Sequence, residues 1–158
     1  MANTSLAGTY YITAQHSGKV LAVENGNAET VVTQQDKQDL DEQKWTLTEV
    51  STGVYTITNV ATGLVMDVTG SSTADGTSVI QYANVGSTNQ QWRFVESTNG
   101  SYEIVNVHSG KNLDIDGNST QNGANLIQWI QTGGENQKFV LLNSVSIDST
   151  IESLPSVH

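Results

Sequence analysis

The sequence predicts an all-β domain built from three related units, because short motifs recur along it at a fixed spacing. Each unit closes on glutamine, any residue and an aromatic, at Gln43-Lys44-Trp45, Gln90-Gln91-Trp92 and Gln137-Lys138-Phe139, 47 residues apart both times. Each unit also opens on the pattern Gly-x-Tyr-x-Ile, which begins at Gly8, Gly53 and Gly100. A fixed period in this range is typical of repeat architectures, in which one unit cannot bury its apolar face alone. In a chain of 158 residues, the three units must therefore close on one another around one core.

Within each unit, apolar residues alternate with polar ones over short runs that glycine, asparagine or serine interrupts. This pattern is typical of short strands joined by turns, with about four strands per unit. The first strand carries the Tyr-x-Ile opening, and a turn follows it at Ser17-Gly18, Thr62-Gly63 or Ser109-Gly110.

The later strands correspond between the units in the same way. The second strand holds Leu21-Ala22-Val23, Met66-Asp67-Val68 or Leu113-Asp114-Ile115. The third strand holds Val32-Thr33-Gln34, Val79-Ile80-Gln81 or Leu126-Ile127-Gln128. The fourth strand contains the closing aromatic and an apolar partner, which is Leu47, Phe94 or Leu141. Helix signals are nearly absent, so all-β is the expected fold class.

The repeats define one domain without a long linker. We expect this domain to span residues 1–143, with the repeats at 8–52, 53–99 and 100–142. Residues 144–158 lie outside the repeats. The alternation of Val145 and Ile147 is compatible with an added strand or an oligomer contact, and an unpacked tail is an equal alternative.

Charge and composition narrow the classes of partner. The chain carries 16 acidic against 6 basic residues, a formal net charge of −10, and only 14% of its residues are charged. Nucleic acid and anionic membrane surfaces require clustered Lys and Arg, so neither is expected as a partner. No apolar run is long enough for membrane insertion and no leader is visible, which favours a cytoplasmic protein or one released by a non-classical route. The many neutral polar residues suit a neutral polyol ligand.

The three Gln-x-aromatic closings, with an apolar-Asp-apolar triplet upstream in two units, resemble the ricin B-type lectins. In being short and free of cysteine, the chain resembles the small fungal members of that family. The resemblance covers roughly residues 8–142. It implies a β-trefoil, in which six strands form a short barrel and six more cap it as hairpins about a pseudo-threefold axis. Closing a sheet in this way removes its exposed edges.

The alternation of the second strand singles out two aspartates. In Met66-Asp67-Val68 and Leu113-Asp114-Ile115 the flanking apolar residues face the core, so the carboxylate must face the other way. A carboxylate accepts hydrogen bonds from two neighbouring sugar hydroxyls, and its charge strengthens them. The alternative is that each Asp side chain caps the turn that follows it. The lectin resemblance favours ligand binding.

An aromatic and two amides complete each candidate site. Tyr82 and Trp129 follow the third strand, and a flat ring with a polar handle suits the apolar C–H face of galactose, although both residues could instead be core. Asn89 and Asn136 precede the closing glutamines and offer both a donor and an acceptor. The resemblance implies sugar contact for these asparagines and for Gln90 and Gln137. The glutamines recur in all three repeats, which favours a role in holding backbone turns.

The first repeat departs from this pattern at every position of the site. Ala22 stands in place of the aspartate, Gln35 in place of the aromatic and Glu42 in place of the asparagine. The segment between Ala22 and Gln34 is also two residues shorter than its counterparts. We therefore expect two binding sites, in the second and third repeats.

Other chemistries find no support in the sequence. Residues 114–118 lack the spacing of a calcium loop, and His16 and His108 lack the spacing of metal ligands, so no metal or cofactor is expected. Asp67 and Asp114 lie in different repeats, too far apart for a glycosidase pair, which needs roughly 5–9.5 Å. We therefore expect no catalysis.

The sequence thus predicts a lectin for terminal galactose or N-acetylgalactosamine on glycans or glycoproteins, with an agglutinating, defensive role and a possible homodimer. Two alternatives remain open. One is a β-trefoil protease inhibitor that acts through its loops, and the other is a sugar-targeting module of a larger enzyme or toxin.

Overall fold

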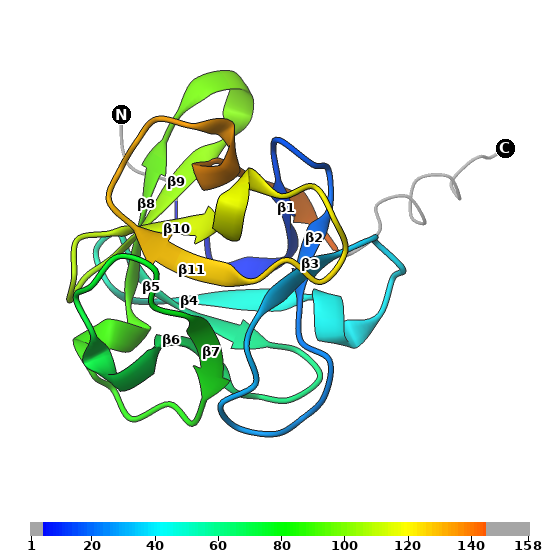
Figure 1. The fold of residues 1–158 in the computed structure, drawn as a ribbon. Helices are drawn as coiled ribbons and strands as arrows, with labels where there is room; N and C mark the ends of the chain where they lie inside the picture. Colours follow the sequence, from blue (N-terminus) through cyan, green and yellow to red (C-terminus); the bar gives the residue numbers. More distant parts are fainter. Residues whose placement is uncertain (1–4, 145–158) are drawn as a thin grey trace, which may run out of the picture.

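The computed structural model describes residues 5–144, and these form an all-β fold (Figure 1). The residues of the expected tail beyond Ser144, including Val145 and Ile147, lie outside the described part of the chain. The strands are β1 (Gly8–Ala14), β2 (Val20–Ala22), β3 (Thr33–Gln35), β4 (Trp45–Ser51), β5 (Val54–Asn59), β6 (Val65–Val68), β7 (Val79–Tyr82), β8 (Trp92–Glu96), β9 (Tyr102–Asn106), β10 (Asn112–Ile115), β11 (Leu126–Trp129) and β12 (Phe139–Asn143).

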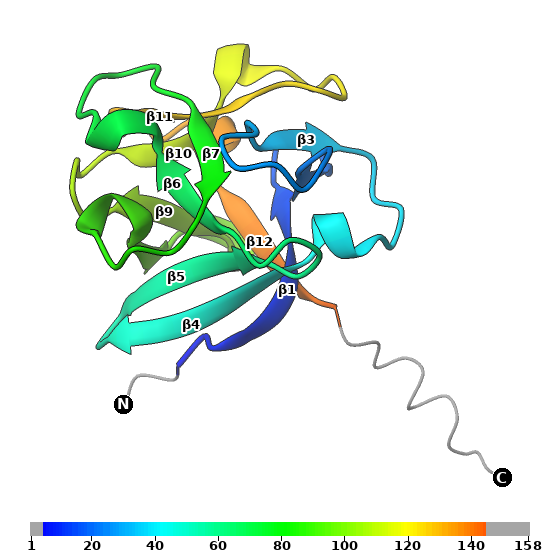
Figure 2. The ribbon, with the colours of Figure 1, turned by 90° about the horizontal axis from the view of Figure 1, so that it is seen from below.

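Half of the strands close into a barrel. Strand β1 pairs with β4, and the antiparallel pairing continues through β5, β8, β9 and β12 back to β1. The other strands pair as the hairpins β2–β3, β6–β7 and β10–β11. Figure 2 shows these hairpins gathered at one end of the barrel. The predicted β-trefoil is therefore confirmed.

Single backbone bridges join the hairpins of neighbouring repeats. They link Val31 to Ile80, Ser78 to Ile127 and Asn125 to Thr33. Each bridge therefore connects one repeat to the next, and the last connects the third repeat back to the first. This ring holds the cap together about the pseudo-threefold axis.

The closing aromatics form the centre of the core, as the sequence predicts. Trp45, Trp92 and Phe139 are fully buried with the apolar residues of the barrel strands. The buried indole N–H of Trp45 donates to the carbonyl of Leu21 at 2.9 Å, and that of Trp92 donates to the carbonyl of Met66 at 3.3 Å. These bonds avoid the penalty of an unpaired buried donor. They also fix β2 and β6 against the barrel.

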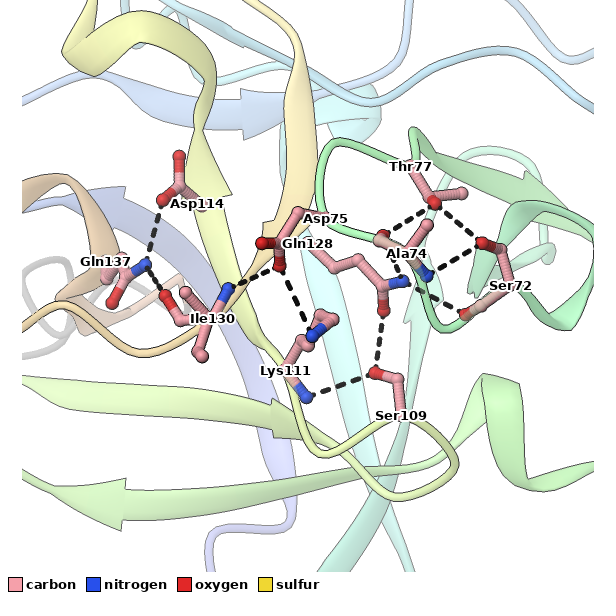
Figure 3. Close-up of polar contacts among 10 residues, drawn as sticks. All are labelled: Ser72, Ala74, Asp75, Thr77, Ser109, Lys111, Asp114, Gln128, Ile130 and Gln137. Atoms are coloured by element: carbon pink, nitrogen blue, oxygen red, sulfur yellow. Dashed lines mark hydrogen bonds and ion pairs between the residues drawn. The ribbon is translucent and has the colours of Figure 1, made fainter.

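A buried glutamine in the third strand of each repeat clamps the loop of the preceding repeat. In the third repeat, Gln128 donates to the carbonyls of Ser72 and Ala74 at 3.0 and 2.9 Å and accepts from the Ser109 hydroxyl at 2.7 Å (Figure 3). Gln81 and Gln34 make the same three bonds, two to carbonyls of the preceding repeat and one to a hydroxyl of their own repeat. Their partners are Asn25, Asn27 and Thr62 for Gln81, and Ser119, Gln121 and Ser17 for Gln34.

No helix among the described residues is long and apolar enough to cross a membrane.

Candidate functional site

The aspartate of the second repeat faces a pocket on the outside of the cap. Its neighbours Met66 and Val68 on β6 are fully buried in the core, so the alternation of the strand turns Asp67 away from it. Asp67 as a whole is only 6% exposed. Its Oδ1 accepts from Asn89 Nδ2 at 3.2 Å, and its Oδ2 accepts from Gln90 Nε2 at 2.9 Å. Each oxygen keeps a further acceptor site for a ligand hydroxyl.

This second-repeat pocket has a volume of about 620 Å³. Asp67 and the one-turn 3-10 helix that follows it (Thr69–Ser71) form one side of the pocket, and Tyr82 on β7 and Asn89 also line it. Two residues from the first repeat, Glu29 and Val31, complete the lining. Tyr82 is 38% exposed, so it lies at the rim and not in the core.

The third repeat forms the same arrangement. Asp114 Oδ1 accepts from Asn136 at 3.1 Å, and Oδ2 accepts from Gln137 at 2.9 Å. The third-repeat pocket has a volume of about 370 Å³, and Asp114, Trp129 and Asn136 all line it. Trp129 is 38% exposed, which matches Tyr82. Apart from the closing glutamines, the residues predicted for each site thus line one pocket in each of the two repeats.

The closing glutamines, for which sugar contact is also expected, lie behind the aspartates and outside the pocket linings. Gln90 and Gln137 are 0% exposed and neither lines its pocket. Gln137 uses both donors of its amide, on Asp114 and on the carbonyl of Ile130 at 2.9 Å (Figure 3). Its oxygen accepts from the Thr132 N–H. Gln90 bonds the carbonyl of Ala83 and the N–H of Val85 in the same way. Neither glutamine thus has an unused amide donor, and each holds the carboxylate of its repeat in place.

The asparagines keep a place in the pockets. Both hydrogens of Asn89 Nδ2 serve Asp67 and the carbonyl of Val68, and those of Asn136 serve Asp114 and the carbonyl of Ile115. A ligand can therefore use only the amide oxygen of each asparagine, as an acceptor for a hydroxyl, and at Asn89 this oxygen already accepts one hydrogen bond from the Ser87 hydroxyl.

Burial raises the pKa of both aspartates above the ordinary value for an aspartic acid. The amide donors oppose this effect at each site. At Asp114, the nearby Asp116 raises the pKa further and His16 lowers it. When ionised, each carboxylate lies in a partly desolvated environment, where hydrogen bonds to it are stronger than in water.

The first repeat lacks the turn that walls the other two pockets. In the second repeat four residues separate Asp67 from Ser72, whereas only Val23 and Glu24 separate Ala22 from Asn25. Asn25 and Ser72 are equivalent, because the same glutamine clamp binds both carbonyls. Residues 23–32, all of them described, contain no 3-10 helix. The two missing residues are therefore those of the pocket wall, and Ala22 offers no acceptor.

No group of three or more His, Asp or Glu side chains in residues 5–144 is placed to hold a metal ion.

Family comparison agrees with this geometry. The model of the ricin-type β-trefoil lectin domain-like family matches residues 2–82 and 88–154. The chain belongs to the ricin-type β-trefoil lectin-like family. The comparison with curated proteins gives no match.

Solved structures of this family fold resemble the chain closely. The designed threefold-symmetric protein ThreeFoil is 42% identical with a TM-score of 0.84, and the match covers 86% of this chain and 99% of that one. An exo-β-1,3-galactanase from Clostridium thermocellum is 33% identical with a TM-score of 0.84, over 90% of this chain and 31% of the galactanase. The chain thus spans about a third of that enzyme. The Rhizoctonia solani agglutinin shares the fold at 23% identity, with a TM-score of 0.80 over 90% of this chain and 99% of the agglutinin.

Proposed function

We propose that this lectin-family protein binds terminal galactose or N-acetylgalactosamine at two sites, one in the second repeat and one in the third. The observation that carries the proposal is the duplicated pocket. An oriented carboxylate, an exposed aromatic and an asparagine line it in each of these two repeats and are missing together from the first.

The three groups suit the chemistry of a hexose. Asp67 or Asp114 accepts bonds from two adjacent hydroxyls, and the aromatic at the rim packs against the C–H face of the ring. Asn89 or Asn136 accepts from a further hydroxyl. Because such pockets are shallow, we expect a monovalent Kd on the order of 0.1–1 mM. Two sites per chain, or four in a dimer, raise the effective affinity for a surface rich in glycans.

Relatives of the same fold guide the choice of sugar. The galactanase, at 33% identity, acts on a β-1,3-galactan by its name. The ricin B-like lectin of Macrolepiota procera is in complex with lactose, and the earthworm R-type lectin is in complex with GalNAc. These two lectins are 19% and 23% identical and share the fold, so they indicate which sugars to test first.

We infer that the chain binds without catalysis, as expected for a member of a lectin family. A second candidate is a sugar-targeting module of a larger protein, and the galactanase match favours it because this fold forms only part of that enzyme. The mass of the native protein, measured by immunoblot of its source, distinguishes the two.

The double variant Asp67→Ala with Asp114→Ala tests the binding proposal. We expect it to lose retention on galactose resin and agglutination of red cells, while its circular dichroism and cooperative melting persist. The double variant Glu24→Ala with Glu96→Ala is the matched control, because it removes two exposed carboxylates outside both pockets. Retention of the Asp variant on the resin would show that the proposed sites are wrong.

A further inference from the structure

The two pockets differ in which repeats contribute their lining residues. The second-repeat pocket includes Glu29 and Val31 of the first repeat, whereas the third-repeat pocket is lined by residues of its own repeat. The second-repeat pocket is also larger, about 620 Å³ against about 370 Å³. The extra space thus coincides with a carboxylate from another repeat, whereas the second carboxylate of the third-repeat pocket, Asp116, belongs to its own repeat.

Glu29 occupies a backbone position that favours glycine. Its φ is 72°, and the equivalent residues Gly76 and Gly123 have φ values of 88° and 89°. The N–H of Glu29 donates to Gln81 at 2.7 Å, and those of Gly76 and Gly123 donate to Gln128 and Gln34 at 2.8 Å. The local structure is therefore the same in all three repeats. A glutamate in this left-handed region is strained, and such strain is concentrated at functional sites.

The position borders the aromatic rim. A Cβ placed on Gly76 would lie 3.7 Å from Cζ3 of Trp129, the platform of the third repeat. By the repeat symmetry, Glu29 borders Tyr82, and both line the second-repeat pocket. The Glu29 side chain is exposed, and its carboxylate makes no hydrogen bond or ion pair within residues 5–144. It is free to accept from a ligand.

We propose that Glu29 makes the second-repeat site an extended one that binds two sugar units. This inference rests on the proposed function. The terminal galactose lies on Asp67 and Tyr82, and the next sugar lies against Val31 and donates its hydroxyls to Glu29. The third-repeat site, with Gly76 at the equivalent position, binds the terminal sugar alone.

Calorimetry with galactose and β-1,3-galactobiose on chains with a single site tests this inference. In the Asp114→Ala background, which keeps the second-repeat site, we expect the disaccharide to bind about tenfold more tightly, as one charge-assisted hydrogen bond would give. In the Asp67→Ala background we expect nearly equal affinities for the two ligands. Glu29→Gly added to Asp114→Ala should abolish the preference and raise the Tm by about 2 °C, because glycine relieves the strain.

Glu24→Gln in the same background is the control for loss of charge alone, because Glu24 is exposed on the same loop and outside the pocket. It should keep the tenfold preference. Equal preference at the two sites, or a preference that survives Glu29→Gly, would overturn the inference while leaving the binding proposal intact. Failure of the wild type to bind either sugar would overturn the proposed function itself, and the inference with it.

Discussion

At the scale of single residues, the two aspartates are placed for ligand binding at some expense of stability. Burial raises the pKa of Asp67 and Asp114, which means that the folded state holds their protons more tightly than the unfolded state does. By linkage, their contribution to the free energy of unfolding becomes less favourable as pH rises through the folded pKa and more favourable as pH falls through it. The ionised state, which is the one proposed to bind sugar, is thus the one that the fold disfavours.

We expect the affinity for galactose to decrease as the pH is lowered from about 7 to about 4, because a protonated carboxyl is a weaker hydrogen-bond acceptor. The loss should begin at a higher pH than an ordinary aspartic acid would give. Calorimetric Kd values over this range measure it, with thermal melts to confirm that the protein stays folded. A Kd that is constant down to about pH 4 would contradict the assignment of the carboxylates.

The sequence predicts the direction of these aspartates correctly, because strand alternation alone decides which way a side chain faces. It also identifies the exposed aromatics, since the closing aromatics already supply the core. It does not separate Gln90 and Gln137 from the residues that line the pockets. That distinction is three-dimensional, because the amide donors of both glutamines are already used by the aspartate and by a backbone carbonyl.

At the scale of elements, the closing glutamine of each repeat holds the backbone of a turn, and this role is separable from holding the aspartate of the proposed site. Gln43 in the first repeat makes the same two backbone bonds as its counterparts, to the carbonyl of Asp36 at 2.8 Å and the N–H of Gln38 at 2.7 Å. It does so with Ala22 where an aspartate stands elsewhere. The turn therefore forms without a site, and the site is added to it.

Gln43→Ala and Gln137→Ala form a matched pair that tests this separation. Each should lower the free energy of unfolding by about 1–3 kcal/mol, because buried backbone groups lose their partners. Only Gln137→Ala should weaken sugar binding at the third-repeat site, measured in the Asp67→Ala background, because only Gln137 holds a carboxylate. An equal effect of both variants on binding would show that the glutamine does not position Asp114.

The missing pocket wall of the first repeat could be predicted from the sequence only in part. The sequence reveals that the first repeat is two residues short, but the length alone does not locate the gap. The clamp on Asn25 and Ser72 locates it in the turn next to the aspartate position. A deletion in a loop thus becomes the loss of one wall of a binding site.

At the scale of the whole molecule, the three repeats hold one another in a cycle. Gln34, Gln81 and Gln128 each clamp the loop of the preceding repeat, and the backbone bridges follow the same order. These glutamines recur in every repeat of the sequence, which indicates a structural role. The loop carbonyls that they clamp lie 54–87 residues away in the chain, so no local pattern identifies these contacts. The first repeat, which lacks the residues of the proposed sites, is one part of this cycle, so removing it would open the ring.

The scaffold is threefold but the proposed function is twofold, and the number of galactose molecules bound per chain tests this proposal most directly. Titration followed by nuclear magnetic resonance should give two sites in the wild type, one in Asp67→Ala, one in Asp114→Ala and none in the double variant. The resonances of the second and third repeats should shift independently, and those around Ala22 should stay in place. A third bound sugar with shifts around Ala22, or a single site that both variants abolish, would contradict the account.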